Sequence, residues 1–153
     1  MMHVVLVHPQ IPGNTGSAGR TCLAAGARLH LVEPLGFSLD EARVRRAGLD
    51  YWPYVDLKVH DSWNALKQDL PGVDDAFFFT RHAERSFLDE PPMPSEPIFV
   101  FGSETKGLPP QVLKAHWSRR YSLPILSPHV RSLNLANTVT AVVYEGLRRQ
   151  GRR

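Results

Sequence analysis

Three segments of the sequence place glycines, amides and charged side chains directly after short apolar runs. They span residues 9–20 (PQIPGNTGSAGR), 101–108 (FGSETKGL) and 123–137 (LPILSPHVRSLNLAN). Glycines at the start of a loop or helix expose backbone N–H groups to a ligand, and a nearby arginine or carboxylate can orient that ligand. The segments therefore indicate a binding site. It is not a nucleotide site of the common kinds, because neither Gly-x-Gly-x-x-Gly nor a phosphate loop ending in Lys-Ser/Thr is present.

The first segment contains an expected helix start and one arginine. Asn14 is expected to cap a helix that runs to about Ala25 and stops at Gly26. Arg20 lies in that helix, where it could meet a phosphate or a ribose. Taken alone, an ordinary capped helix with a surface arginine explains this segment better than a binding site does.

The second segment follows an apolar run and is bounded by two glycines. Gly102 allows the backbone to approach a ligand, Gly107 permits a tight turn, and Glu104 is a carboxylate among bare amides. The substitution Gly102→Val is expected to abolish ligand binding while leaving the fold intact. A glycine-bounded surface loop is an equally good explanation of the segment alone.

The third segment leads into a long apolar helix. Ser132 and Asn134 both precede that helix, and serine and asparagine are good helix caps. Two such residues exceed what one helix start needs, which favours a second role for at least one of them. A redundant cap remains the alternative.

The composition limits which classes of partner and metal site the protein can have. The net charge of +3 and the pI of about 9.3 permit a polyanionic partner without requiring one. Arginines cluster near residues 43–46 and 148–153, either as solvated helix surface or as contacts to that partner. The single cysteine, Cys22, is expected to be a small buried residue, and the scattered histidines give no support for a metal site.

The hydrophobic pattern predicts one α/β domain over residues 1–153, with helices on both faces of a parallel sheet. No segment reaches the ~18 apolar residues of a membrane span, and the start lacks the features of a signal peptide, so we expect a cytoplasmic protein. Strands are expected at 4–7, 29–32, 55–59, 76–80, 98–101 and 121–123, and helices at 14–25, 40–47, 61–70, 110–116 and 135–149.

Taken together, the three segments resemble the three motifs of the SPOUT superfamily of RNA methyltransferases, in its SpoU branch. Length and spacing are most similar to the minimal tRNA (cytidine/uridine-34-2′-O)-methyltransferases of the TrmL type, and the stretches 29–37, 45–51 and 142–145 match as well. The resemblance covers essentially the whole chain. It departs at Ser103, where many relatives have proline, and at His8, where Glu or Asn is frequent.

The resemblance implies a C-terminal trefoil knot, S-adenosylmethionine as cofactor, a tRNA substrate and a homodimer without metal. It assigns Arg20 and Asn14 as catalytic. Arg45, Arg46, Arg131 and Tyr144, together with Arg20, would contact RNA. The implied cofactor residues are Phe79, Thr80, Gly102, Ser103, Glu104, Gly107, Leu123, Ile125, Ser132, Leu133 and Asn134.

The implied reaction is transfer of a methyl group to a ribose 2′-hydroxyl, at the wobble nucleotide of a tRNA. Arginine is a reluctant base, so we expect Arg20 to orient a phosphate and stabilise the developing alkoxide. Three alternatives stay open at this point: ribose methylation of ribosomal RNA, a non-catalytic RNA-binding module, and a nucleotide-binding protein of the flavodoxin type.

Overall fold

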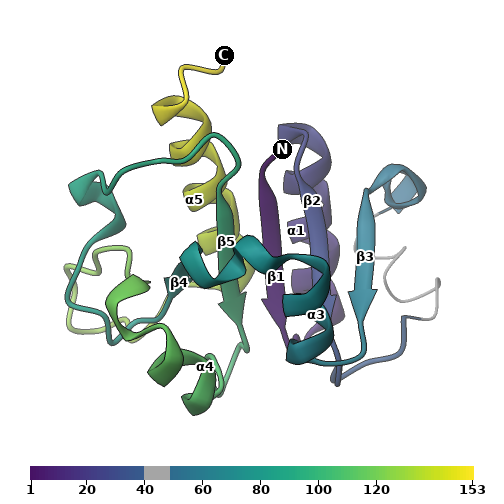
Figure 1. Cartoon of the computed structure of the whole chain (residues 1–153), viewed down its shortest axis with the longest axis horizontal. Coiled ribbons are helices and arrows are strands. Elements are labelled where there is room, and N and C mark those ends of the chain that lie inside the picture. The colour runs from purple at the N-terminus through teal and green to yellow at the C-terminus, as the bar shows by residue number, and fades with distance from the viewer. Residues whose placement is uncertain (40–48) are drawn as a thin grey trace.

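The structure, a computed structural model, describes residues 1–39 and 49–153 and is built around a six-stranded sheet. Every pair of neighbouring strands is parallel, in the order β3-β2-β1-β5-β4-β6. This confirms the predicted parallel sheet. Strands β1 to β5 are labelled in Figure 1. The strands are β1 (His3–Val7), β2 (Arg28–Val32), β3 (Leu57–His60), β4 (Phe77–Phe79), β5 (Ile98–Gly102) and β6 (Arg120–Tyr121).

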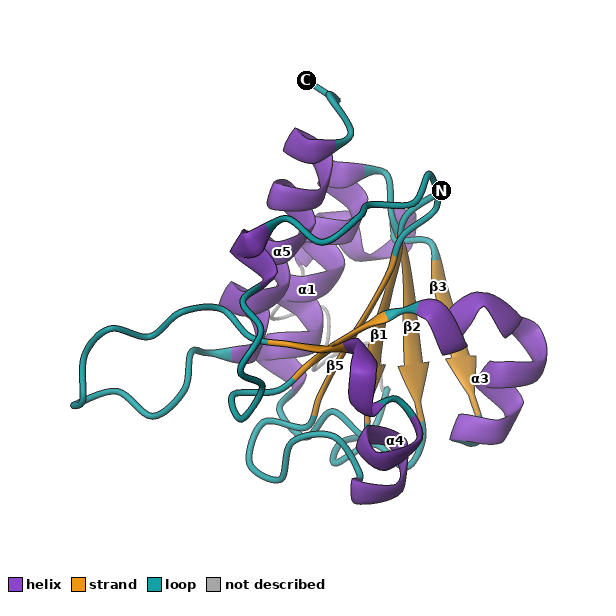
Figure 2. Cartoon of the chain, turned by 60° about the vertical axis from the view of Figure 1, so that its left-hand side comes forward, coloured by secondary structure: helices purple, strands orange, loops and turns teal. Residues whose placement is uncertain are grey.

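Helices cover both faces of the sheet, as predicted. One face carries α1 (Pro12–Ala25) and α5 (Leu135–Arg149), and the other carries α3 (Trp63–Asp69) and α4 (Pro110–Ala115) (Figure 2). The predicted helix over 40–47 lies outside the described residues. Short 3-10 helices occupy Leu49–Tyr54, Pro71–Asp75, Phe87–Asp89 and Trp117–Arg119.

Two apolar clusters fill the space between the sheet and its helices. Alternate residues of β1 point to opposite sides: Val4 and Leu6 join the cluster under α1 and α5, whereas Val5 and Val7 join the cluster on the α3 and α4 side. All four are fully buried, and burying such a side chain contributes about 1.5–3 kcal/mol. Both faces of the strand are therefore apolar, which is why it reads as a continuous hydrophobic run.

Helix α5 has the bounds expected from the sequence. Val139, Val142 and Val143 are fully buried in the core, so its apolar stripe packs inward. Cys22 of α1 is buried in the same cluster, as predicted, and burial raises the pKa of its thiol to about 12. Its thiol is therefore protonated and unreactive at neutral pH.

Several predicted boundaries were wrong. The strand expected at 55–59 starts at Leu57, because the preceding 3-10 turn continues through a bond from the Val55 N–H to the Trp52 carbonyl. The strand expected at 121–123 is β6, and beyond it Ser122 forms only an isolated bridge to Ser86. Its partner β4 has already ended there, so regular pairing cannot continue.

Predicted helix caps were also misplaced. Helix α1 begins at Pro12, so Asn14 lies inside it and does not cap it. The helix expected over 61–70, with Asp61 as its predicted cap, is α3, which starts at Trp63 and is capped by Ser62, whose Oγ accepts from the Ala65 N–H at 3.1 Å. The stop at Gly26 is confirmed, with the left-handed φ of 70° that glycine tolerates.

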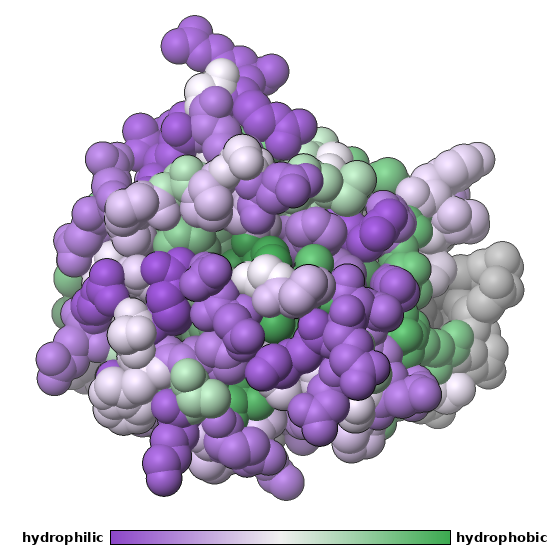
Figure 3. All heavy atoms as spheres, in the orientation of Figure 1, coloured by the Kyte–Doolittle hydropathy of each residue, from purple (hydrophilic) through white to green (hydrophobic). Residues whose placement is uncertain are grey.

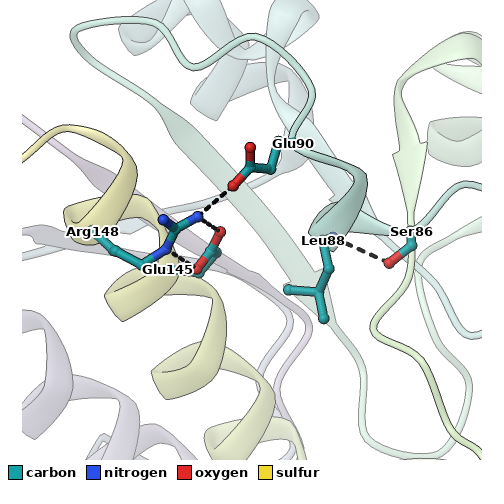
Figure 4. Close-up of polar contacts among 5 residues, drawn as sticks. All are labelled: Ser86, Leu88, Glu90, Glu145 and Arg148. Atoms are coloured by element: carbon teal, nitrogen blue, oxygen red, sulfur yellow. Dashed lines mark hydrogen bonds and ion pairs between the residues drawn. The ribbon is translucent and has the colours of Figure 1, made fainter.

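The C-terminal end of α5 holds the loop that precedes β5. The guanidinium of Arg148 bonds both carboxylate oxygens of Glu145 and also reaches Glu90, as Figure 4 shows. Glu90 follows a 3-10 turn whose start is capped by Ser86, which accepts from the Leu88 N–H. The carboxylates of Glu145 and then Glu90 raise the pKa of Arg148 above its usual range. Arg148 therefore pairs with acidic residues of its own chain.

Three histidines form a chain of hydrogen bonds across β1, β2 and β3. His3 Nδ1 lies 2.9 Å from His30 Nε2, and His30 Nδ1 lies 2.9 Å from His60 Nε2. His60 Nδ1 in turn lies 3.4 Å from the Asp69 carboxylate at the end of α3. If each neutral ring carries its one proton on Nδ1, every Nδ1–H donates to the next acceptor in the direction of Asp69. All three hydrogen bonds are then made with the rings uncharged.

Burial lowers the pKa of His30 to about 3, aided by His3, His60, Arg28 and Lys58. Burial lowers the pKa of His3 and of His60 as well, against the opposing pull of nearby carboxylates. An unfolded histidine binds a proton below pH ~6.5, whereas the folded chain resists protonation down to lower pH. The stability that these neutral rings supply is therefore complete above pH ~6.5 and is lost as the pH falls toward 3.

We expect the free energy of unfolding to drop by roughly 2 kcal/mol between pH 7 and pH 5 from His30 alone. In His30→Leu this drop should shrink by that amount, even though the variant is less stable at pH 7. Urea unfolding at the two pH values measures it. The exposed His129, changed to Leu, is the control. An equal drop in wild type and His30→Leu would show that the histidine chain does not govern acid stability.

The face of the molecule seen in Figure 3 is mostly hydrophilic, and hydrophobic side chains show only in small areas between polar ones. Within residues 1–39 and 49–153, no helix combines the length and apolar character needed to cross a bilayer. Over the same ranges, His, Cys, Asp and Glu side chains form no group of three or more that could hold a metal ion.

Candidate active site

A pocket of about 350 Å³ opens where β4, β5 and β6 end. Ligands of parallel α/β sheets bind at this carboxyl edge. Its walls come from the residues after β4, the loop after β5, and the long segment between β6 and α5. The lining residues are Phe79, Thr80, Arg81, His82, Phe101, Gly102, Ser103, Glu104, Thr105, Lys106, Gly107, Leu108, Leu113, Ser122, Leu123, Ile125, Arg131, Ser132, Leu133, Leu135 and Thr138.

Glu104 connects the loop after β5 to the start of α1. Its carboxylate accepts from the Gln10 N–H at 2.8 Å and from the Ile11 N–H at 2.7 Å. Helix α1 has no cap from its own side chains, so a carboxylate from far along the chain meets the free amides that precede it. Glu104 thus braces both the loop and the helix start.

Asn14 and Asn134 extend this network to the third segment. Asn14 Nδ2 donates to Glu104 at 3.2 Å, and Asn14 Oδ1 accepts from Asn134 Nδ2 at 3.0 Å. Asn134 also caps α5, because its Oδ1 accepts from the Asn137 N–H. The sequence predicts a second role for Ser132 or Asn134. Asn134 both caps α5 and bonds Asn14, whereas Ser132 does not cap the helix and lines the pocket.

The loop from Ser103 to Gly107 is closed on itself. The Ser103 N–H donates to the Gly107 carbonyl at 2.8 Å, and the Gly107 N–H donates to the Ser103 carbonyl at 3.0 Å. Thr105 is tied to the first segment, since its N–H and hydroxyl both donate to Gln10 Oε1. The loop is thereby fixed before any ligand arrives.

Gly102 has a φ of 131°, and a Cβ built on it would lie 2.2 Å from the carbonyl oxygen of Val7. The expectation that a side chain here would leave the fold intact is therefore wrong. Gly102 pairs with Val7 across β1 and β5, so a methyl group would push two central strands apart.

The predicted cofactor residues are brought together: all of them line the pocket except Asn134, which sits behind it in the hydrogen-bond network. Of the predicted RNA contacts, Arg131 lines the pocket and Tyr144 is exposed on α5. Arg45 and Arg46 lie outside the described residues.

Arg20 and Asn14 do not line the pocket of their own chain. Asn14 is buried within the network described above. Arg20 is exposed on α1, and its guanidinium lies 5.3 Å from the centre of the Tyr51 ring. Within one chain, therefore, the structure does not bring Arg20 to the pocket.

Sequence reasoning missed Arg81, His82, Gln10 and Thr138. Arg81 and His82 directly follow an expected strand, so their position at the carboxyl edge was a usable signal. Gln10 and Thr138 carry no such signal, because only the folded chain places them beside the loop or the pocket. Arg81, Lys106 and Arg131 make the pocket rim basic, which suits an anionic substrate.

The fold and this pocket define an RNA-modifying methylase of the SpoU type, and the chain belongs to the SpoU rRNA Methylase family. The model of that family matches residues 1–144. Among its relatives is the tRNA (cytidine(34)-2′-O)-methyltransferase of Burkholderia ambifaria, 48% identical over 99% of this chain and 97% of that protein. The enzyme of the same name from Acidovorax sp. is 45% identical over 97% of this chain and 91% of its own length.

Solved structures agree with this assignment. One, described as structural insights into the 2-OH methylation of C/U34 on tRNA, has a TM-score of 0.90 and 43% identity, covering 99% of this chain and 98% of that one. The SpoU methyltransferase AviRb from Streptomyces viridochromogenes, solved with the cofactor AdoMet, shares the fold with a TM-score of 0.81 and 24% identity. That match covers 99% of this chain and 58% of AviRb.

Proposed function

We propose that this protein transfers a methyl group from S-adenosylmethionine to the ribose 2′-hydroxyl of the wobble nucleotide, position 34, of a tRNA. One observation carries the proposal. Segments near residues 10, 104 and 134 meet through the Glu104 network beside the pocket at the carboxyl edge of the sheet. The relatives that share this chain almost end to end bear the name of that activity.

The pocket suits S-adenosylmethionine. Its volume lies in the range for small-molecule sites, and it combines apolar side chains with backbone amides and hydroxyls. Leu123, Ile125 and Leu133 offer apolar walls for a flat adenine ring. The loop from Gly102 to Gly107 offers a close backbone wall. When bound, the cofactor supplies an electrophilic methyl carbon on a positively charged sulfur.

The protein's own residues position the substrate. The basic rim of Arg81, Lys106 and Arg131 would hold phosphates of the RNA beside the pocket. Bringing the ribose oxygen into line can lower the barrier by up to about 7–11 kcal/mol in ideal cases. Methyl transfer would join that oxygen to the methyl carbon and break its bond to sulfur, and the hydroxyl proton would leave to a nearby phosphate or water.

Arg20 orients the phosphate and stabilises the developing alkoxide in this proposal. Its exposure on α1, away from the pocket of its own chain, supports a homodimer in which it serves the pocket of the partner subunit. We propose a cytoplasmic, single-domain protein over residues 1–153, as befits a tRNA-modifying enzyme. The trefoil knot stays a prediction for this chain.

The test uses unmodified tRNA, ribosomal RNA and a methyl-labelled donor, followed by mass analysis of the nucleosides. We expect label in 2′-O-methylcytidine or 2′-O-methyluridine from tRNA position 34, and none from ribosomal RNA. Arg20→Lys should reduce kcat at least about 10-fold, because lysine lacks the planar fork of arginine. Label on a base, or in ribosomal RNA, would contradict the function. Normal turnover by Arg20→Lys would contradict only the role of Arg20.

A further inference from the structure

An exposed tryptophan with a stacked arginine lies between α4 and β6. Trp117 is 62% exposed, an unusual state for the largest apolar side chain. The Arg120 guanidinium lies 3.2 Å from the centre of its indole ring, and Arg120 Nε donates to the Trp117 carbonyl at 3.0 Å. These contacts fix the ring on the surface while much of it stays open to solvent.

Further cations surround this tryptophan. Arg85 Nη1 donates to the Ser118 carbonyl at 2.7 Å, and its guanidinium lies 4.7 Å from the centre of the Tyr121 ring. Lys114 is exposed one turn earlier, on α4. The acids nearby are Glu84, which adjoins Arg85 in sequence, and Asp74 and Asp75; Asp74 is already bonded to His116 and lies 3.4 Å from Lys67. These acids are outnumbered by the cations Arg81, Arg85, Arg119, Arg120 and Lys114.

The same cations continue to the rim of the pocket. The Ser122 N–H donates to the Arg85 carbonyl, and the Thr80 N–H donates to the Tyr121 carbonyl, so the segments after β4 and around β6 run side by side. Arg81, next to Thr80, lines the pocket. A basic strip therefore leads from the pocket rim to Trp117.

We propose that this strip, formed by Arg81, Arg85, Arg120 and Trp117 and here called the Trp117 strip, binds the anticodon arm of the tRNA beyond the target nucleotide. The inference rests on the function proposed above. Arginines bind backbone phosphates, and an exposed aromatic ring already carrying a guanidinium offers a stacking platform for an unpaired base.

A protein partner fits this strip less well than RNA does. Protein interfaces also favour tryptophan and arginine, but around an apolar core depleted in charge, whereas here a single aromatic ring stands among cations. The strip is also continuous with the rim where the substrate must enter. Single-stranded loops are recognised by this combination of a basic track with aromatic stacking.

The test measures tRNA affinity separately from methyl transfer. Trp117→Ala should weaken tRNA binding about 10-fold or more, and Trp117→Phe should restore most of it, since a phenyl ring still stacks. Arg120→Gln should weaken binding and reduce the slope of log affinity against log salt by about one. Arg28→Gln, at the amino edge of β2, is the matched control. Affinity for S-adenosylmethionine and kcat at saturating tRNA should not change.

Unchanged tRNA affinity in Trp117→Ala and Arg120→Gln would overturn the proposal. So would an altered oligomeric mass with unchanged tRNA affinity, which would make the strip a protein contact. If the variants lose affinity while wild type methylates no tRNA, the strip stands and the proposed function fails. If wild type methylates position 34 while the variants bind normally, only the strip fails.

Discussion

Gly102→Ala is expected to leave little folded protein. The new methyl group would lie 2.2 Å from the Val7 carbonyl oxygen and 2.9 Å from the Val7 nitrogen, both in the central strand β1. The backbone also has a φ of 131°, which a residue with a side chain rarely adopts. Moving β1 away from β5 should cost more than about 4 kcal/mol, a large part of the 5–15 kcal/mol that stabilises a typical domain.

Gly107→Ala is the matched control for this prediction. Gly107 belongs to the same loop and has a φ of 70°, but a Cβ there would meet nothing within 4 Å. Its cost should stay near 1 kcal/mol, from backbone strain alone. Circular dichroism and thermal unfolding of both variants measure the difference. If Gly102→Ala melts within a few degrees of Gly107→Ala, the close approach of β1 and β5 is not a constraint on this loop.

Glu104→Gln is the second substitution for which we expect a large effect. The carboxylate now accepts from two backbone N–H groups and from Asn14 Nδ2, and all three partners are donors. Glutamine keeps the shape but turns one acceptor into an NH₂ group that would face a donor. The free energy of unfolding should fall by about 2–3 kcal/mol. Affinity for S-adenosylmethionine should fall at least about 10-fold, because the loop of the pocket loses its brace.

Isothermal titration with S-adenosylmethionine and urea unfolding measure the two effects of this change. Glu84→Gln, which neutralises an exposed carboxylate, is the control and should change neither quantity. A Glu104→Gln variant with wild-type cofactor affinity and wild-type stability would show that the network does not hold the pocket together. Lost affinity with unchanged stability would instead place Glu104 in direct contact with the cofactor.

The network gives the pocket a rigid back wall made from distant parts of the chain. Asn134 caps α5 and bonds Asn14, while Glu104 meets the amides before α1. A substitution of any one of these side chains therefore affects the starts of α1 and α5 and the loop after β5. Such coupling predicts that substitutions in the network will not be additive.

Much of the fold could be read from local sequence. Continuous apolar runs such as 4–7 and 98–101 fit strands buried on both faces, and the stripe Val139, Val142 and Val143 fits a helix with one face in the core. These patterns depend on nearby residues alone. The three chemical segments could also be singled out locally, because glycines, amides and charges after apolar runs are visible without a structure.

The roles within those segments could not be read in this way. Asn14 had the appearance of a helix cap, yet the amides before α1 are met by Glu104, which lies ninety residues away in sequence. Gly102 had the appearance of a ligand-facing glycine, yet its missing side chain first serves the approach of β1 to β5. When a distant segment supplies the hydrogen-bond partner or the steric clash, the residues near the site in sequence do not reveal it. The amino-acid sequence alone specified which functional groups are available, and only long-range packing determined which of their atoms form hydrogen bonds with one another.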